Sequence, residues 1–230
     1  MTLHRFFVPP GDIVGDRFAL PASIERQVRS VLRLSDADRI VLLTGDGNEM
    51  VCRLDGEACV VEDRRPAPGE PAHRLRVVQA LLKGDALETV VQHGTELGVA
   101  SFGLMVTERC VAREISARRL ERLRVIAREA AEQSERGIVP PVEGPVPLQD
   151  ALAPGSVLLF ERHGIAARLG QLEPPDVVII GPEGGFSPAE VRAAEASGVR
   201  LAWLGPRILR SETVAAAAAA VILSRTGDFA

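Results

Sequence analysis

Residues 177–190, VVIIGPEGGFSPAE, combine an apolar run, a glycine-rich turn and the start of a helix. The run VVII is apolar at every position, which predicts a strand buried on both faces of a sheet. After the turn, Ser187-Pro188 and then Glu190 form the pattern of a capping box with proline at the first helical position. Ligands of α/β proteins bind where such a strand turns into such a helix. The stretch therefore predicts an α/β fold with a binding site at the turn between this strand and this helix.

Gly184 and Gly185 allow the backbone of this turn to take a positive φ or to let another backbone approach closely. The turn lacks the lysine of a Walker phosphate loop, and its glycine spacing is not that of the dinucleotide-binding fingerprint. A tight turn that binds nothing is an equally simple interpretation of the stretch taken alone. The residues of the turn therefore leave its ligand open.

A second turn of the same design lies in residues 202–213, AWLGPRILRSET. An apolar run ends at Gly205-Pro206, and a helix begins after a short loop, with Ser211 as its predicted cap. Ile208 and Leu209 are apolar residues in a loop where exposure is expected. They could clamp a flat ring whose edge is read by main-chain atoms, or they could plug the core beneath the loop. If the two turns follow adjacent strands, they face the same crevice.

Outward from these turns, apolar runs alternate with helical patterns from residue 75 onward, which predicts a parallel sheet covered by helices. The predicted strands are 75–82, 101–107, 156–161, 176–181 and 200–205, and the predicted helices are 85–97, 116–135, 188–197 and 212–226.

The first 62 residues have a different pattern. Asp46-Gly47 and Asp55-Gly56 each separate two strand-like runs, which predicts a meander of hairpins, and residues 23–34 have helical spacing. Residues 62–74 are rich in proline and charge and carry no periodicity, so we place a domain boundary there. The predicted domains are 1–70 and 71–230.

Composition excludes several classes of protein. The 230 residues are 46% hydrophobic and 25% charged with a formal charge of −4, which is typical of a globular protein and not of a nonspecific nucleic-acid coat. Three cysteines without C-x-x-C spacing and four scattered histidines predict no disulfide framework, no metal site and a reducing, cytoplasmic compartment. The longest apolar run, residues 214–223, is shorter than the ~20 residues of a membrane span, so no membrane partner is predicted.

Several stretches in the same order are similar to one known family. IIGPEGGFSPAE (179–190) and LGPRILRSET (204–213) resemble the RsmE family, the ribosomal small-subunit RNA uridine-N3 methyltransferases of the SPOUT superfamily. LLKGDALETVVQHGTELGV (81–99), REAAEQSERGIVPPV (128–142), HRFFV (4–8) and VLRL (31–34) agree with that family as well. The resemblance covers residues 4 to 226. Departures from the family pattern fall at Gln27 and at His93-Gly94, outside the two turns.

The resemblance implies a PUA-like β-barrel that binds RNA in residues 1–70 and a SPOUT α/β domain with a C-terminal trefoil knot in residues 71–230. It also implies a homodimer that uses S-adenosylmethionine to methylate uridine N3 in 16S ribosomal RNA or the 30S subunit. The cofactor would bind in the loops after Phe160, Ile180 and Leu204. The residues predicted to bind it are Leu159, Phe160, Ile180, Gly181, Pro182, Gly184, Gly185, Leu204, Gly205, Ile208, Leu209 and Thr213.

Methyl transfer to uridine N3 requires a group that takes the N3 proton or stabilises the uridine anion. Glu161 and Glu183 are candidates for the base, and either could instead neutralise the sulfonium or serve the turn. Arg210 is a candidate for stabilising a uridine oxygen or a phosphate, or it could pair with Glu161 to shape the loop. The residues predicted to contact RNA are Arg5, Arg26, Arg29, Arg33 and Arg136.

Two other functions fit the same residues. A SPOUT methyltransferase that acts on another RNA base would have the same cofactor loops. A non-catalytic RNA-binding module would use the first domain for RNA and the second for association. The intact glycine turns and the Arg207–Arg210 segment favour an enzyme.

Overall fold

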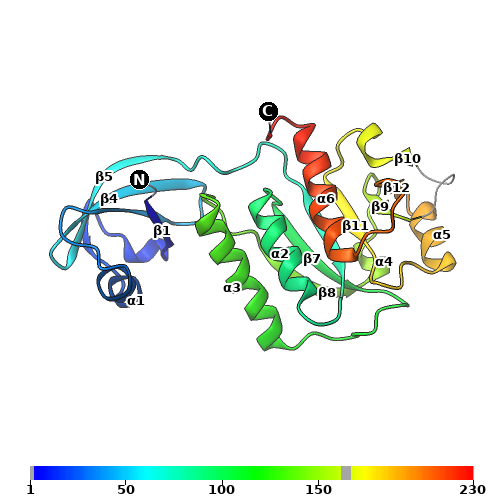
Figure 1. The fold of residues 1–230 in the computed structure, drawn as a ribbon, viewed down its shortest axis with the longest axis horizontal. Coiled ribbons are helices and arrows are strands. Elements are labelled where there is room, and N and C mark those ends of the chain that lie inside the picture. Colours follow the sequence, from blue (N-terminus) through cyan, green and yellow to red (C-terminus); the bar gives the residue numbers. More distant parts are fainter. Residues whose placement is uncertain (1–2, 162–166, 230) are drawn as a thin grey trace. The chain divides into compact units, whose positions relative to one another are not determined.

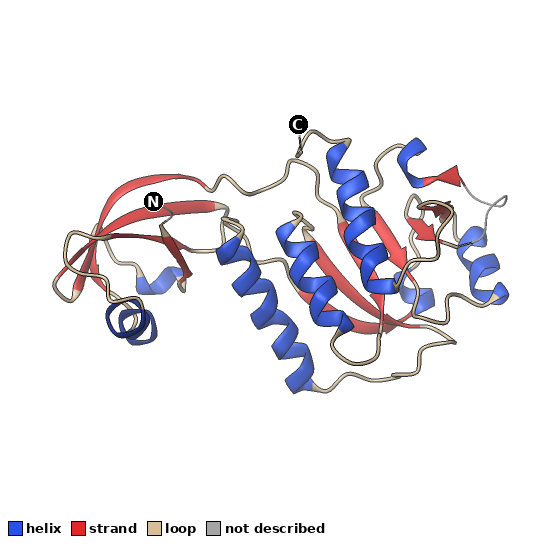
Figure 2. Ribbon diagram, in the orientation of Figure 1, coloured by secondary structure: helices blue, strands red, loops and turns tan. Residues whose placement is uncertain are grey.

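The computed structural model describes residues 3–161 and 167–229 and divides into two compact units (Figures 1 and 2). The first unit contains Met1–Glu70 and Ala131–Val139, and the second contains Pro71–Ala130 and Pro140–Ala230. Residues 131–139 comprise the last turn of the long helix α3 (Ala117–Gln133) and the segment after it, and their contacts group them with the first unit.

The first unit is built on a mixed five-stranded sheet with the order β1-β3-β4-β5-β2. Both hairpins predicted from Asp-Gly turns are present, and Gly47 and Gly56 take positive φ values of 87° and 63°. Strand β1 adds to β3 in parallel, and β1 and β2 form the two edges without pairing with each other. The strands are β1 (His4–Phe7), β2 (Arg17–Ala19), β3 (Arg39–Leu43), β4 (Asn48–Asp55) and β5 (Ala58–Pro66).

A short helical segment covers the core of this sheet. The helix predicted over 23–34 is split into α1 (Ala22–Arg26) and a π-helical turn, η2 (Gln27–Val31), and the chain leaves it with Arg33 at a φ of 57°. Its apolar spacing still holds, because Ile24 and Val28 are buried against the sheet. The single turn η1 (Pro10–Asp12) precedes it.

The core of the first unit holds two reduced cysteines, Cys52 and Cys59. The hydrogen bond with the Cys59 thiol, together with burial, raises the pKa of the Cys52 thiol. A protonated thiol in an apolar core acts as a small packing group.

The second unit is built on a seven-stranded sheet in which every pairing is parallel, as the alternation of strands and helices predicts. The strand order is β10-β12-β9-β11-β6-β7-β8. The strands are β6 (Arg76–Ala80), β7 (Ser101–Val106), β8 (Val142–Pro147), β9 (Val157–Leu159), β10 (Ala167–Arg168), β11 (Val177–Ile180) and β12 (Arg200–Trp203).

Helices connect these strands, and two of them lie side by side in Figure 1, namely α2 (Ala86–Glu96) and α6 (Ser211–Ser224). Small residues allow the close packing that the alanine run predicts, since Ala215, Ala218 and Ala219 of α6 are buried. In α2, a Cβ added at Gly94 would come within 2.7 Å of the Phe102 ring, so glycine is required there. The remaining elements are α4 (Leu148–Ala151), α5 (Pro188–Ala196) and η3 (Leu169–Gln171).

The strand order determines which loops meet. Strand β9 lies between β11 and β12, and β11 in turn pairs with β6. Because all these strands are parallel, their carboxyl ends emerge at the same edge of the sheet. The turns after β9, β11 and β12 are therefore neighbours, although they are separated in sequence by some twenty residues each.

Candidate functional site

A cavity of about 550 Å³ lies at this edge of the sheet, between the turns after β9, β11 and β12. Its volume is in the range of sites that hold a small molecule. Every residue predicted to bind the cofactor or to act in catalysis lines it, except Gly184 and Thr213. Those that line it are Leu159, Phe160, Glu161, Ile180, Gly181, Pro182, Glu183, Gly185, Leu204, Gly205, Ile208, Leu209 and Arg210.

The two neighbouring glycines of the first turn serve different purposes. Gly185 takes a φ of 65°, and its N–H donates to the Pro182 carbonyl at 2.9 Å, which closes the turn. Gly184 does not take a positive φ. A Cβ added there would lie 3.2 Å from the Cβ of Arg109, whose Nη1 donates to the Gly184 carbonyl at 3.0 Å. Gly184 thus provides close approach for Arg109, and only Gly185 requires glycine for its backbone angle.

The helix start after this turn has the predicted geometry. The Glu190 N–H donates to Ser187 Oγ at 3.3 Å, and the Ser187 N–H donates to Glu190 Oε2 at 2.8 Å, which completes the capping box. The second carboxylate oxygen of Glu190 accepts the Glu108 N–H at 2.7 Å. The cap of α5 therefore also holds the loop after β7.

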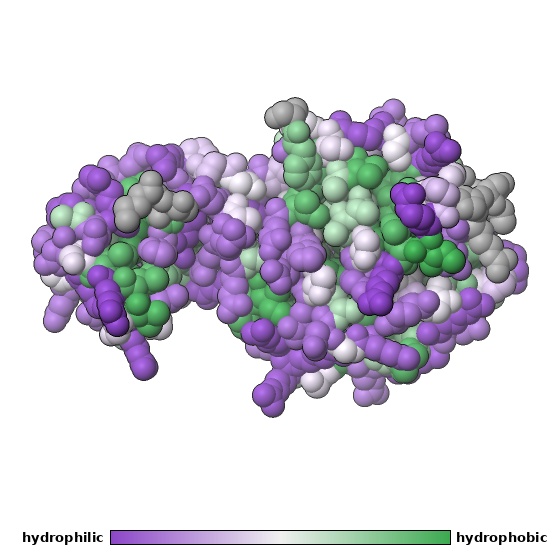
Figure 3. Space-filling model, viewed as in Figure 1, coloured by the Kyte–Doolittle hydropathy of each residue, from purple (hydrophilic) through white to green (hydrophobic). Residues whose placement is uncertain are grey.

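The second turn presents its apolar residues to the cavity. Ile208 is 85% exposed and Leu209 is half-buried, so neither plugs the core beneath the loop. Trp203, at the end of β12, also lines the cavity, with the guanidinium carbon of Arg168 at 5.2 Å from its ring centroid. Figure 3 shows hydrophobic surface along α6 and the loop that precedes it, with hydrophilic side chains around it.

The predicted cap of α6 is wrong in its detail. The residue at the N-cap position is Arg210, which makes no side-chain cap, and Ser211 is already the first helical residue. The Ser211 hydroxyl donates to the Gly181 carbonyl at 2.6 Å. This residue therefore joins the second turn to the first, which a cap assignment from local sequence could not reveal.

The cavity is lined by both acidic and basic residues. Glu161, Glu183 and Glu212 are its acidic residues, and Lys83, Arg207 and Arg210 are its basic ones. Glu183 Oε1 accepts the backbone N–H of Lys83 at 3.0 Å, so this carboxylate links the loop after β6 to the glycine turn. Several lining residues were not predicted from the sequence. Lys83 carried a signal as the one lysine of the chain; the others are Ala86, Phe186, Trp203, Arg207, Ser211, Glu212 and Val214.

The arginines predicted to contact RNA fall into two groups. Arg26 and Arg33 are exposed on the first unit, and Arg29 is half-buried with bonds to the Leu34 and Gly56 carbonyls and to the Asp36 carboxylate.

Arg5 and Arg136 are instead held in internal ion pairs. The Arg5 side chain is 8% exposed and lies 2.8 Å from Glu135, while that of Arg136 is 2% exposed and lies 3.1 Å from Glu70. Their guanidinium groups are committed to fastening residues 131–139 to the first unit. We therefore infer that Arg5 and Arg136 do not contact RNA.

This assignment predicts a loss of stability at Arg136. Removing one partner of a buried ion pair leaves the other charge uncompensated, so Arg136→Met is expected to lower the free energy of unfolding of the first unit by about 3 kcal/mol. Urea denaturation followed by circular dichroism measures this. Arg26→Met is the matched control on an exposed arginine and is expected to leave stability unchanged. Equal stability of the two variants would contradict the ion-pair role.

A second cavity of about 690 Å³ lies at the carboxyl ends of β7 and β8, beside α5. The Arg113 guanidinium in its wall is bonded to the Thr107 and Glu108 carbonyls, at 3.0 and 2.6 Å. The wall is otherwise largely apolar and contains three residues of the Pro145–Pro147 segment. Its lining contains none of the glycines of the two Gly-Pro turns, so the first cavity is the better candidate site.

Within residues 3–161 and 167–229, no group of three or more histidine, cysteine, aspartate or glutamate side chains could hold a metal ion. In the same described ranges, none of the helices has the length and apolar character needed to cross a membrane.

Comparison with known proteins gives one consistent result. A family model described as an RNA methyltransferase domain matches residues 69–223. The chain is 31% identical to the ribosomal RNA small subunit methyltransferase E of Synechocystis sp., over 95% of this chain and 77% of the relative. It is 32% identical to the Bacillus subtilis protein of the same name, over 85% of each chain.

Solved structures agree with these relatives. The structure of ribosomal RNA small subunit methyltransferase E from Neisseria gonorrhoeae, bound to S-adenosyl methionine, superposes with a TM-score of 0.89 at 30% identity over 100% of both chains. A putative methyltransferase from Legionella pneumophila, in complex with the same cofactor, superposes with a TM-score of 0.84 at 28% identity over 98% of both chains.

Proposed function

Because this chain belongs to the ribosomal RNA small subunit methyltransferase E family, we propose that it transfers the methyl group of S-adenosylmethionine to N3 of a uridine in 16S ribosomal RNA. The observation that carries the proposal is the cavity between two Gly-Pro turns at the carboxyl ends of adjacent parallel strands. Two similar proteins of known structure are bound to this cofactor.

The residues of the cavity fit S-adenosylmethionine. The exposed Ile208 and the half-buried Leu209 offer apolar contact for the adenine ring, and the bared main chain of the Gly181 and Gly205 turns offers donors and acceptors for its edge and for the ribose. The sulfonium is a cation, so the nearby carboxylates favour it. When bound, the cofactor supplies an activated methyl group on sulfur. No phosphate is present in it, which accounts for a glycine turn without a phosphate-binding lysine.

The attacking N3 of uridine carries a proton. Either a cavity residue accepts this proton, or cavity residues stabilise the uridine anion that its loss leaves. Glu183 already accepts the Lys83 N–H with one carboxylate oxygen, which favours a role in holding the turn. We assign the proton to Glu161, which follows β9 and is exposed at the cavity. Arg210 is placed to stabilise a uridine oxygen on which negative charge develops.

Glutamine substitutions test this division of roles, because glutamine keeps the size of the side chain and removes its charge. We expect Glu161→Gln to lower kcat by about a hundredfold, the scale of general-base catalysis, with little change in the affinity for S-adenosylmethionine. Glu183→Gln, which can still accept the Lys83 N–H, is expected to keep most of its activity. Single-turnover kinetics and calorimetry measure both quantities. A Glu183 variant that is inactive beside an active Glu161 variant would reverse the assignment.

The proposal also includes RNA binding by the first unit, the topology of the second unit and the assembly of the protein. We propose that the five-stranded sheet of the first unit belongs to a PUA-like barrel that binds RNA, with Arg26, Arg29 and Arg33 contacting phosphates. We also propose that the second unit has the trefoil knot of the SPOUT superfamily, and that the protein acts in the cytoplasm as a homodimer on 16S ribosomal RNA or the 30S subunit.

The product identifies the function. The purified protein is incubated with 30S subunits or with 16S ribosomal RNA and S-adenosylmethionine, and the digested RNA is analysed by nucleoside mass spectrometry. We expect 3-methyluridine. A different methylated nucleoside would show a methyltransferase that acts on another base. Absence of methylation with both substrates, together with absence of cofactor binding, would leave only an RNA-binding module.

A further inference from the structure

We propose that Gln79, a buried residue outside the cavity, is a positioning residue that holds both cofactor turns in place through Ser211 and Gly181. The inference rests on the proposed function, because its effect is measured on S-adenosylmethionine binding. Gln79 does not line the cavity, whereas Ser211 and Gly181 do.

The position of Gln79 is unusual for its side chain. Strand β6 has the sequence RVVQA, and Val77, Val78 and Ala80 around Gln79 are all buried. Gln79 itself is 0% exposed. Burying an amide costs free energy unless hydrogen bonds compensate, so an apolar residue would be expected here if the strand served only the core.

The hydrogen bonds of the amide lead to the cavity. Gln79 Nε2 donates to Ser211 Oγ at 2.9 Å, and it lies 3.3 Å from the Gly181 carbonyl oxygen. Ser211 Oγ in turn donates to the same Gly181 carbonyl at 2.6 Å. The orientation of the amide follows from these partners, because nitrogen, not oxygen, must face carbonyl oxygens.

These bonds form a closed triangle that joins three segments distant in sequence. Gln79 pairs in register with Ile180, the last residue of β11, so its amide lies beneath the point where the glycine turn begins. Ser211 is the first residue of α6 and follows the loop that carries Ile208 and Leu209. The triangle therefore fixes the start of the first turn and the end of the second relative to the same strand.

The affinity for a cofactor that binds between two turns depends on the distance between those turns. A buried hydrogen-bond network can fix that distance. If Gln79 served only the stability of the sheet, its loss would lower stability and leave binding unchanged. If it positions the turns, its loss weakens binding in a protein that is still folded. These two results distinguish the roles.

The experiment compares Gln79→Met, Ser211→Ala and Ser211→Thr with the wild-type protein. Trp203, the one tryptophan of the chain, lines the cavity, so its fluorescence serves as the reporter in titrations with S-adenosylmethionine. We expect Gln79→Met and Ser211→Ala each to raise Kd about tenfold, the scale of one or two buried hydrogen bonds. Ser211→Thr keeps the hydroxyl and is expected to bind close to the wild-type level.

The double variant gives a sharper test. Because the two residues act through one network, Gln79→Met combined with Ser211→Ala is expected to raise Kd no more than either substitution alone. Thr95→Val is the matched control, since Thr95 is also 0% exposed with a hydrogen-bonded hydroxyl, on α2 and outside the cavity wall. It is expected to lower stability in urea without changing Kd.

The outcomes separate the inference from the function on which it rests. A wild-type protein that binds no S-adenosylmethionine would contradict the proposed function and the inference with it. If the wild-type protein binds S-adenosylmethionine and the Gln79→Met and Ser211→Ala variants bind it with the same affinity as the wild type, the inference is contradicted and the proposed function is not. If Gln79→Met fails to fold, the contrast between Ser211→Ala and Ser211→Thr still decides it: equal affinities of these two would refute the network.

Discussion

Replacing Gly185 with valine is expected to lower the affinity for S-adenosylmethionine by about a hundredfold in a protein that remains folded. Gly185 has a φ of 65°, an angle that a β-branched residue adopts only at a cost of up to about 3 kcal/mol. The turn can relieve this strain by leaving the conformation that lines the cavity. Each 1.4 kcal/mol corresponds to about a tenfold change in affinity, so the loss is large. Calorimetric titration with the cofactor measures it.

A matched glycine controls for the strain itself. Gly155 takes a φ of 85° in the turn before β9, and an added Cβ would meet no atom within 4 Å. Gly155→Val is therefore expected to lower stability to a similar degree without affecting the cavity. If Gly155→Val and Gly185→Val bind the cofactor equally well, the glycine turn is a scaffold and does not contact the cofactor.

Replacing Arg210 with alanine is the second change with a large expected effect. We expect kcat to fall by about a hundredfold, the scale of removing one group that stabilises developing negative charge. We expect the affinity for S-adenosylmethionine to change by less than about twofold, because the guanidinium interacts with the uridine and the cofactor carries positive charge at sulfur. Single-turnover methylation of 30S subunits and calorimetry measure the two quantities separately.

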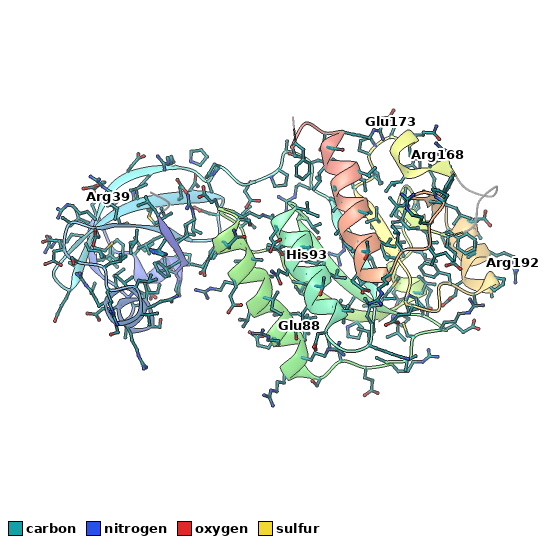
Figure 4. The ribbon with its side chains drawn as sticks, in the orientation of Figure 1. Arg39, Glu88, His93, Arg168, Glu173 and Arg192 are labelled. Atoms are coloured by element: carbon teal, nitrogen blue, oxygen red, sulfur yellow. The ribbon has the colours of Figure 1, made fainter. Side chains whose placement is uncertain are left out.

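Arg192 provides the control for this experiment. It is exposed on α5 and is labelled in Figure 4, and it does not line the cavity. Arg192→Ala should leave both kcat and cofactor affinity unchanged. Equal loss of turnover and of cofactor affinity in Arg210→Ala would place Arg210 in the cofactor site and not at the reacting base.

Much of the fold could be predicted because local patterns determine it. The Asp-Gly turns gave both hairpins of the first unit, and the alternation of apolar runs with helical spacing gave the parallel sheet. Strands β8 and β10 were missed for physical reasons. Strand β8, VEGPVP, contains glycine and proline, which are rare in strands, and β10 is two residues long.

The candidate site was predictable where it consists of main chain. Gly-Pro turns after apolar strands indicate exposed main-chain atoms. Nearly all of the residues predicted from these turns line the cavity. Side chains whose partners are distant in sequence were not predictable. Arg136 pairs with a glutamate 66 residues away, and Ser211 bonds to Gly181 across 30 residues. Local charge or capping patterns contain no information about such partners.

Gln79 shows the same limit in another form. A single amide in an apolar strand was visible in the sequence, but only the parallel register with β11 places it beneath the turn. Its function depends on topology, which brings the carboxyl ends of β6, β11 and the start of α6 together.

The central claim is that the two Gly-Pro turns together bind S-adenosylmethionine, and a crystal structure of the protein grown with this cofactor tests it most directly. We predict that the adenine ring lies between the turn at Gly181–Gly185 and the loop containing Ile208 and Leu209. Electron density for the cofactor in the cavity beside α5, or its absence from the Gly-Pro turns in crystals saturated with it, would contradict the claim.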